Sequence, residues 1–521
     1  MVGSVSCFRD RGWLDADVAE DLARRGEQVI LVRPETKPDD IHGIIAAAGV
    51  VTSRGGVTSH AAVVTRGLGK PCIVGCEGMQ VDLELGEMNG NGHTIKEGDR
   101  VSMDGTLGQV YVGELATVNP RLEDLPEANV LLGWADEARR LGVMANADTP
   151  ADARQALAMG AGGIGLCRTE HMFLDPNRLP AVRQMLLNSE AAEEWRREHG
   201  DRHIDPLANP FMNPEVSDIP AAVVDFYQAL DRVKRLQTND FRGILRVMSR
   251  RPVIIRLLDA PLHEFLPPYD ELLVELATLR ATGAPHEEVA EKDAFLQRVD
   301  SLRESNPMLG HRGCRLGLSF PDIYRMQVEA IITAGAQLVA EGVEVHPEIM
   351  IPLTVDVEEM RRLRADLTRV AAEVQERMGV EVHYKFGTMV ETPRAALTAG
   401  AVAEESEFFS FGTNDLTQMT YGFSRDDAEG KFLRNYINEG VLPADPFASI
   451  DRDGVGELVR LAVNAGRKVR PDLEIGICGE HGGDPSSVAF CHEAGLDYVS
   501  CSPFRVPVAR LAAAQAALQD G

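Results

Sequence analysis

Short apolar runs alternate with long amphipathic stretches from about residue 141 to the C-terminus. The runs are rich in β-branched residues, whereas stretches such as DVEEMRRLRADLTRVAAEVQERM repeat apolar residues at helical spacing. This alternation is typical of parallel strands covered by helices. About eight such units over some 380 residues predict a (β/α)8 barrel of the TIM type. The expected strands lie in VMANA, GIGLC, VIIRLL, EIMIPL, KFGTMVE, FFSFGT, EIGICG and YVSCS.

Three stretches do not fit this alternation. The run CRLGL at 314–318 is a weak candidate for a fourth strand, which leaves the number of strands open by one. The stretches 188–246 and 268–304 lack the regular spacing and predict insertions or a helical subdomain.

The first 113 residues predict a smaller α/β domain. DADVAEDLARRG, VILVR, PDDIHGIIAAAG and VVT alternate helical and strand patterns, and short strands with Gly-rich turns follow. Residues 114–140 contain VNPRLEDLPEA and a charged helical pattern, a composition typical of a linker. The predicted organisation is therefore a small swivelling domain at 1–113, a linker at 114–140 and the barrel at 141–521.

Charge and composition exclude several classes of protein. The formal net charge of −27, from 53 Lys and Arg against 80 Asp and Glu, argues against a surface that binds nucleic acid. No apolar stretch approaches the roughly 18 residues of a membrane span, and the start of the chain has no signal-peptide pattern. We therefore expect a cytoplasmic protein that binds neither nucleic acid nor membrane, with its cysteines reduced.

The first candidate for chemistry is His60, in the run RGGVTSHAAVVTRGLGKPCIVG. Gly55 and Gly56 permit a tight turn, Ser59 can cap a helix, and His60 then falls in the first helical turn. A helix N-terminus disfavours imidazolium, so His60 would be neutral and nucleophilic, and a phosphoryl group on it would meet free backbone N–H groups. The spacing alone is equally compatible with a surface histidine near an ordinary helix cap.

A second set of polar residues falls at or beside the ends of predicted barrel strands, where barrel enzymes place their active sites. Glu391 and Asp415 are carboxylates on neighbouring strands without an adjacent basic residue, which suits a hard cation such as Mg²⁺. Arginines at the same ends could bind phosphate or carboxylate groups. A structural ion pair is the alternative for any single member. The set comprises Arg168, Arg256, Arg312, Glu391, Asn414 and Asp415, with Arg425 as a further candidate.

Cys478 lies between a strand and a Gly-rich turn, in GICGEHGGD. Its thiol could face the barrel's cavity and exchange a proton with a substrate carbon. A buried, inert cysteine is the more common case for such a position. Glu480 and His481, beside it, are unassigned candidates for supporting contacts.

The order and wording of the motifs carry a family resemblance. The chain contains, in sequence, GGVTSHAAVVTRGLGKPCIVG, GIGLCRTEHMF, RLLDAPLHEFLP, NPMLGHRGCRLG, GTMVETPRAAL, FFSFGTNDLTQMTYGFSRDD and GICGEHGGDPSSVAF. From about residue 20 to the C-terminus these motifs resemble the pyruvate phosphate dikinase family. Enzyme I of the sugar phosphotransferase system carries a helical domain ahead of its histidine, whereas only 59 residues precede His60 here. Phosphoenolpyruvate synthases typically have Cys where this chain has Ser59, and LLDAPLHEFLP and GHRGCRLG also favour the dikinase family.

The resemblance implies a phosphotransferase that moves a phosphoryl group between phospho-His60 and pyruvate or phosphoenolpyruvate. It implies Mg²⁺ held by Glu391 and Asp415, Cys478 as the acid/base at the methyl carbon of pyruvate, and a homodimer formed through the barrel. The implied substrate-binding residues are Arg168, Arg256, Arg312, Glu391, Thr413, Asn414 and Asp415.

The family's nucleotide-binding domain has no visible counterpart. Only 59 residues precede His60 and no GxxxxGK[ST] sequence is present, so we expect ATP chemistry to need a separate nucleotide-binding protein. Two alternatives stay open. One is a phosphoenolpyruvate-fed phosphohistidine donor to another acceptor, and the other is a non-catalytic paralogue that binds or regulates an intact dikinase. The joint presence of His60, Glu391, Asp415 and Cys478 argues against the paralogue.

Overall fold

The computed structural model describes residues 10–13, 15–36, 40–55, 62, 65, 70–76, 78–83, 85–105, 107–113, 115, 126–200, 219–260, 262–304 and 306–520. The chain forms two compact units. The barrel unit comprises residues 140–421 and 450–501, and the flanking unit comprises residues 1–139, 422–449 and 502–521.

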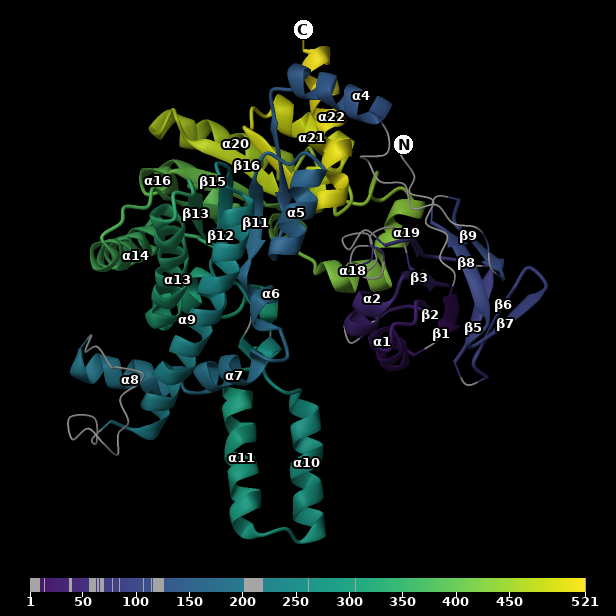
Figure 1. Cartoon of the computed structure of the whole chain (residues 1–521), viewed down its shortest axis with the longest axis horizontal. Coiled ribbons are helices and arrows are strands. Elements are labelled where there is room, and N and C mark those ends of the chain that lie inside the picture. The colour runs from purple at the N-terminus through teal and green to yellow at the C-terminus, as the bar shows by residue number, and fades with distance from the viewer. Residues whose placement is uncertain are drawn as a thin grey trace. The chain divides into compact units, whose positions relative to one another are not determined.

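The barrel unit is built on a closed barrel of eight parallel strands, which confirms the predicted fold class (Figure 1). The last strand returns to pair with the first, so that Gly142 lies opposite Tyr498. The strands are β10 (Gly142–Asn146), β11 (Ile164–Arg168), β12 (Pro252–Arg256), β13 (His346–Ile351), β14 (Lys385–Val390), β15 (Phe408–Gly412), β16 (Glu474–Cys478) and β17 (Tyr498–Cys501). Each coincides with one of the eight predicted runs.

The inside of the barrel is filled by side chains. Because successive residues of a strand face opposite sides, every strand can contribute an inward-facing residue to a common layer. Each of the eight strands supplies one buried member of an inner cluster: Met144, Leu166, Ile254, Met350, Met389, Phe408, Cys478 and Tyr498. The barrel is therefore a packed core, and ligands have access only at its ends.

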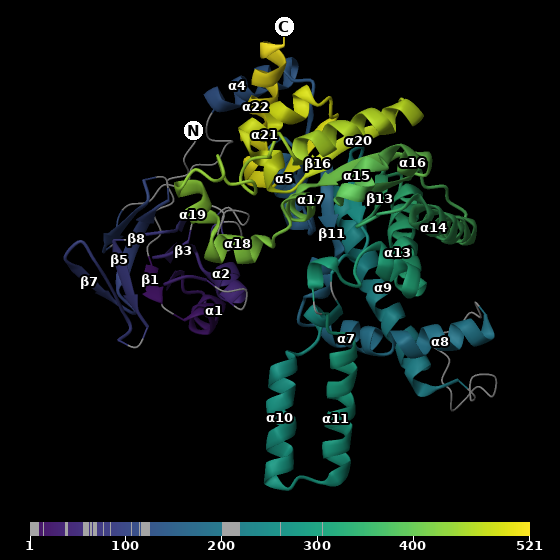
Figure 2. The same ribbon diagram turned by 180° about the vertical axis from the view of Figure 1, so that it is seen from behind.

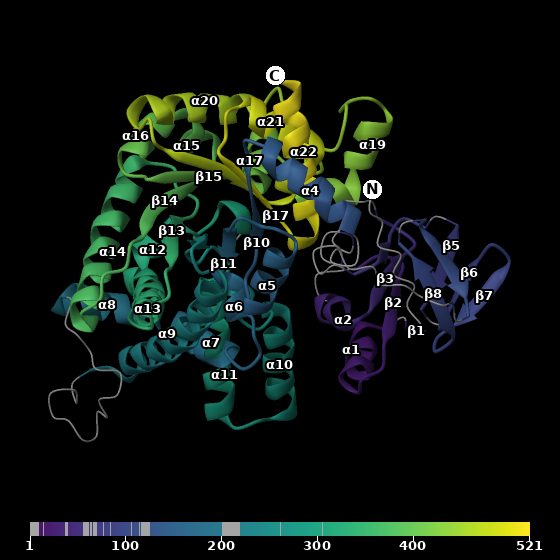
Figure 3. The same ribbon diagram turned by 45° about the horizontal axis from the view of Figure 1, so that its top comes forward.

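Helices lie outside the strands, as α14, α16 and α20 show in Figure 3. They include α5 (Pro150–Ala158), α9 (Ala221–Val247), α13 (Pro321–Ala340), α14 (Val357–Met378), α15 (Pro393–Leu397), α16 (Ala399–Glu404), α17 (Thr413–Tyr421), α20 (Val455–Val469) and α21 (Pro485–Glu493). Helix α9 is paired to α13 through Tyr227–Asp322 at 2.8 Å and Lys234–Glu329 at 3.2 Å. The prediction of an insertion at 188–246 is thus wrong for α9, which is a crossover helix of the barrel.

The second predicted insertion, 268–304, is helical as expected. It forms α10 (Tyr269–Thr282) and α11 (His286–Ser301), which run side by side as a hairpin that projects from the barrel unit (Figures 1 and 2). Leu272, Leu276 and Leu296 are buried between or beneath these helices. Other short helices of the barrel unit are α6 (Thr169–Phe173), α7 (Leu179–Leu187), α8 (Ser189–His199), η3 (Leu262–Phe265), η4 (Pro307–Leu309) and η5 (Glu480–Gly483).

The weak fourth strand near CRLGL is wrong, because this run forms helix α12 (Cys314–Ser319). A short apolar run is compatible with either a helix or a strand, so the residues that it packs against determine which one forms. Leu316 is fully buried, and a Cβ on Gly317 would lie 2.4 Å from the ring of Tyr324. The run is therefore held as a helical turn that packs closely against the start of α13.

The flanking unit contains the predicted α/β elements. Its six-stranded sheet has the order β4-β3-β2-β1-β8-β9, and β5, β6 and β7 form a separate antiparallel sheet. Along β2, Val29 and Leu31 pack with the helices, whereas Ile30 and Val32 pack with the small sheet. The elements are β1 (Asp10–Trp13), α1 (Ala16–Arg24), β2 (Val29–Arg33), α2 (Ile41–Ala46), β3 (Gly49–Thr52), β4 (Cys72–Ile73), β5 (Met79–Asp82), β6 (Glu87–Gly90), β7 (His93–Lys96), β8 (Arg100–Asp104) and β9 (Gln109–Val112).

The flanking unit also includes α4 (Pro126–Ala138) and α22 (Val506–Gln519), which are joined by a 3.0 Å contact between Arg510 Nε and Asp136. Its other helical segments are α18 (Arg425–Lys431), α19 (Leu433–Asn438) and η6 (Pro503–Arg505). Among the helices described in both units, none has the length and apolar character needed to cross a membrane.

Candidate active site

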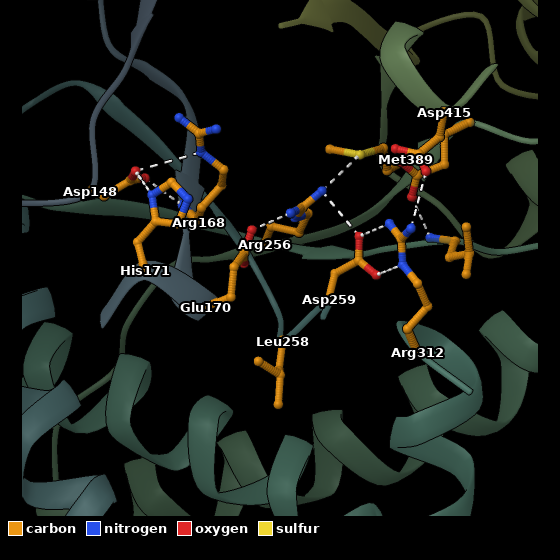
Figure 4. A network of polar contacts seen from close by, with 12 residues as sticks. Asp148, Arg168, Glu170, His171, Arg256, Leu258, Asp259, Arg312, Met389 and Asp415 are labelled. Carbon is orange, nitrogen blue, oxygen red and sulfur yellow. Dashed lines mark hydrogen bonds and ion pairs between the residues drawn. The ribbon is translucent and has the colours of Figure 1, made fainter. Parts of the chain in front are cut away.

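The predicted barrel residues lie together at the carboxyl ends of the strands. Arg168 and Arg256 are the last residues of β11 and β12, and Cys478 is the last residue of β16. Glu391 follows β14 directly, and Asp415 lies in the first turn of α17, directly after β15. Figure 4 shows Arg256 and Arg312 on either side of Asp259, whereas Arg168 lies in a separate group with Asp148 and His171.

Asp259 joins two of the predicted arginines. Its side chain is fully buried and accepts from Arg312 Nε and Nη2, both at 2.8 Å, while Arg256 Nη1 lies 3.1 Å away. Burial alone would raise the pKa of Asp259, but the two guanidinium groups hold it below the ordinary value. The motif LLDAPLHEFLP therefore supplies a fixed anion that orients both cations.

Glu170 is the second anion beside Arg256. The Glu170 carboxylate pairs with Arg256 Nη2, and Arg256 Nη1 also lies 3.7 Å from the sulfur of Met389. Although burial disfavours the charged guanidinium, Glu170 and Asp259 raise the pKa of Arg256. Arg256 is thus a permanently charged group whose position is set from both sides.

Glu391 is a fully buried carboxylate in which one oxygen accepts a hydrogen bond and the other has no partner among the described residues. Its Oε1 accepts from the backbone N–H of Leu353 at 2.6 Å, and within the described residues its Oε2 has no hydrogen-bond partner. Burial, together with the charges of Asp415 and Asp259, raises the pKa of Glu391 well above the ordinary value. A Cβ at position 412 would lie 2.6 Å from Oε2, so Gly412 leaves the space beside this oxygen open.

The second carboxylate, Asp415, is also buried. Burial raises its pKa, against the lowering effect of Arg312, whose Nη1 lies 3.2 Å from Asp415 Oδ1. Both pKa values are raised although Arg256 and Arg312 lower them, so additional positive charge would stabilise the ionised form of these two buried carboxylates. Mg²⁺ often takes only one or two protein carboxylates and completes its shell with water and substrate oxygens. Glu391 and Asp415 fit such an ion, and the described residues contain no cluster of three or more ligands of the usual kinds.

Arg168 is held by a separate pair of residues. Asp148, which follows β10, accepts from the Arg168 backbone N–H at 2.7 Å and lies 3.5 Å from its Nε. His171 Nδ1 contacts the same carboxylate at 2.8 Å. Burial opposes the charge on Asp148, yet Arg168 and His171 hold its pKa below the ordinary value. The Arg168 side chain stays 37% exposed, so a ligand can reach it.

Cys478 is more enclosed than the sequence-based interpretation assumed. Its side chain belongs to the inner layer of the barrel, and the thiol donates to the carbonyl of Phe411 at 3.7 Å. Burial raises the pKa of Cys478 to about 11, although the Ser410 hydroxyl and Arg256 oppose the shift. The resting group at neutral pH is therefore the thiol and not the thiolate.

Thr413 and Asn414 precede Asp415 in the first turn of α17. Thr413 is fully buried, and its hydroxyl contacts His481 Nδ1 at 2.7 Å. Asn414 is partly exposed in the same turn. His481, left unassigned from the sequence, thus lies directly against a predicted substrate-binding residue.

Comparison with known proteins agrees with this arrangement. Residues 123–518 match the family model described as "PEP-utilising enzyme, PEP-binding domain", and residues 26–108 match "PEP-utilising enzyme, mobile domain". The chain belongs to the PEP-utilising enzymes. Their PEP-binding domain is the part that contains every residue of the candidate site described above.

Individual relatives confirm the resemblance found in the motifs. The chain is 47% identical over 506 residues to pyruvate, phosphate dikinase of Entamoeba histolytica, covering 97% of this chain and 53% of that protein. The identity to pyruvate, phosphate dikinase of Clostridium symbiosum is 47% over 511 residues, which covers 98% of this chain and 53% of that protein. The identity to the chloroplastic pyruvate, phosphate dikinase 1 of Arabidopsis thaliana is 50% over 507 residues, which covers 96% of this chain and 48% of that protein. The chain spans about half the length of these relatives.

His60 lies outside the described residues, so its predicted place at a helix start stays a prediction. Part of the run before it is described. Gly55 has φ +103, and a Cβ on Gly75 would lie 2.4 Å from the Gly55 carbonyl oxygen, so two chain segments meet closely there. Of the further candidates, Arg425 pairs with Glu429 at 2.9 Å within α18 and lies over the ring of Phe447.

The anions Asp148, Glu170 and Asp259 are not among the residues predicted from the sequence. Each contacts a predicted arginine, and Glu170 and Asp259 lie within three residues of one in the sequence. Acidic residues close to strand-end arginines are therefore the signal that was available.

Proposed function

We propose that this PEP-utilising enzyme transfers a phosphoryl group between phospho-His60 and pyruvate, in the direction of phosphoenolpyruvate or the reverse. The observation that supports the proposal is the buried oxygen of Glu391 that has no hydrogen-bond partner among the described residues, in a carboxylate that lies near Asp415, Arg256 and Arg312. The similarity to the dikinases supports the same substrates.

The substrate's negative charges would be bound by the arginines. Arg256 and Arg312 are fixed by Asp259, so their guanidinium groups need no rearrangement when a carboxylate or phosphoryl group arrives. Arg168 is the most accessible of the three and would contact the transferring phosphoryl group. Thr413 and Asn414, at the start of α17, would hydrogen-bond the substrate's oxygens.

A divalent cation, Mg²⁺, would be held by Glu391 and Asp415. When bound, it would supply Lewis-acid polarisation of the substrate's carbonyl or enol oxygen. Without the cation, the buried carboxylates of Glu391 and Asp415 would repel the negative charge of an enolate bound beside them.

Cys478 would carry the proton at the methyl carbon. In the direction of pyruvate, the P–O bond of phosphoenolpyruvate breaks, His60 takes the phosphoryl group, and the Cys478 thiol donates its proton to C3. In the opposite direction, Cys478 as thiolate removes a C3 proton and the enolate oxygen attacks the phosphorus of phospho-His60. A thiol with a pKa of about 11 suits the first direction directly.

Stoichiometric pyruvate formation tests this function. The chain mixed with excess phosphoenolpyruvate and Mg²⁺ should release about one pyruvate per His60 in a burst and then stop, since no acceptor for the phosphoryl group is present. The variant E391Q keeps the size of the side chain and should release none. Continued turnover, or an equal burst from E391Q, would show that the phosphoryl group does not stop on the chain as proposed.

The homodimer and a separate nucleotide-binding partner are proposals that rest on the motif resemblance, and the cytoplasmic location is a proposal that rests on the sequence pattern. We likewise propose that phosphorylation of His60 from ATP would need this nucleotide-binding partner.

A further inference from the structure

A side-chain contact links the start of α17 to η5, two segments that follow neighbouring strands at the candidate site. Strands β15 and β16 are paired, with Gly412 opposite Cys478, so their carboxyl ends lie side by side. Helix α17 begins with Thr413 directly after β15, and the residues after β16 form η5. The contact is the 2.7 Å hydrogen bond between Thr413 Oγ1 and His481 Nδ1.

The backbone around His481 leaves its ring little freedom. Gly479 has φ +107, a conformation that other residues rarely adopt, and it turns the chain directly after Cys478. A Cβ on Gly482 would lie 2.1 Å from the Ser500 carbonyl oxygen, so η5 lies flat against the end of β17. His481 between them is 2% exposed. Its ring is therefore a fixed point in the site.

Thr413 directly precedes Asn414 and Asp415, the residues of α17 proposed to bind the substrate and the cation. It is 1% exposed and is the first residue of α17, whereas Asp415 is the third. No connecting loop separates the end of β15 from this helix, so the rotation of the first turn decides where the Asp415 carboxylate points. The hydrogen bond between the Thr413 hydroxyl and the fixed His481 ring resists that rotation.

We propose that His481 is a positioning residue for Asp415, acting through Thr413, and that it sets the affinity of the carboxylate pair for a divalent cation. The inference rests on the proposed function, in which Glu391 and Asp415 hold the cation. His481 itself touches neither the cation nor the substrate. Partners behind a metal ligand typically change metal affinity by about 10- to 100-fold when they are removed.

Binding of Mn²⁺ to the full chain, measured by electron paramagnetic resonance of the free ion, tests the inference without any catalytic step. H481A should weaken Mn²⁺ binding by roughly 10-fold. H481N places its amide where Nδ1 lies and should recover most of this loss. H481Q places its amide near the position of Nε2 and should not. If H481A does not fold, the comparison of H481N with H481Q carries the test.

A double-mutant cycle separates positioning from general stabilisation. T413V removes the hydroxyl at nearly constant size, so T413V, H481A and the double variant should all weaken Mn²⁺ binding to about the same extent. Additive losses, or a lowered melting temperature with unchanged Mn²⁺ affinity, would overturn the proposal. E391Q is the control for the underlying function. If E391Q binds Mn²⁺ as wild type does, the proposed cation site is wrong, whereas a loss in E391Q without one in H481A refutes the role of His481 alone.

Discussion

Replacing Asp259 by asparagine should destabilise the barrel unit strongly. The Asp259 carboxylate accepts hydrogen bonds from Arg312 Nε and Nη2, both at 2.8 Å, and forms an ion pair with Arg256 Nη1 at 3.1 Å. Its side chain has no exposure to solvent. Breaking a buried ion pair by removing one partner costs about 3–5 kcal/mol, because a charge is left buried and uncompensated. Asparagine retains one acceptor oxygen, so we expect about 3 kcal/mol, or somewhat over a hundredfold in the opening equilibrium.

Native-state hydrogen exchange of peptides from β12 and β13, measured at several urea concentrations, reports this opening equilibrium for the barrel unit alone. A matched control is E341Q, because Glu341 also pairs with two arginines, Arg242 and Arg246, but at the surface. Its effect should be much smaller, since exposed ion pairs are screened by solvent. Equal effects of D259N and E341Q would refute the claim that burial makes the Asp259 contacts strong.

The pH dependence gives a second check on the same substitution. The two arginines hold the pKa of Asp259 below the ordinary value of about 4, even though burial opposes this. A depressed pKa means that the contribution of Asp259 is complete above about pH 4 and is lost as the pH falls through the folded-state pKa. The difference between wild type and D259N should therefore be constant near neutrality and shrink only in strong acid.

Two further predictions concern Cys478 and Glu391. In deuterated water with Mg²⁺, exchange of the C3 protons of pyruvate, followed by NMR, should survive H60A and vanish in C478A; the reverse pattern would assign the proton transfer to another group. Because burial and neighbouring carboxylates raise the pKa of Glu391, its ionised form destabilises the protein without a cation at neutral pH. E391Q should thus melt at a higher temperature than wild type without Mg²⁺ and gain less on its addition, and equal gains in both proteins would contradict a cation site at Glu391.

The barrel could be predicted from the sequence because its strands differ from its helices in period and length. The same patterns placed Arg168, Arg256, Glu391 and Cys478 at strand ends, since a strand's end is a local property. The prediction failed at CRLGL, because this apolar run is too short to show a period and its packing against α13 selects a helix. It also failed at α9, a crossover helix most of whose residues had been assigned to a predicted insertion or helical subdomain.

Partner choice within the site could not be predicted. Arg256 pairs with Glu170, 86 residues away, and Arg312 reaches Asp415, 103 residues away. Such pairs depend on how the strand ends meet around the barrel and on which carboxylate is left without another partner. The enclosure of Cys478 is of the same kind, because only the closed barrel shows that the thiol belongs to the inner layer.

Phosphoryl exchange between His60 and the carboxylate site is tested most directly by intact-mass spectrometry at alkaline pH, where phosphohistidine survives. After incubation with phosphoenolpyruvate and Mg²⁺, the wild-type chain should gain the mass of one phosphoryl group, and the gain should be lost on mild acid treatment. H60A and E391Q should gain none, for lack of the acceptor and of the cation site respectively. An unmodified wild-type chain, or an equally modified H60A, would contradict the account.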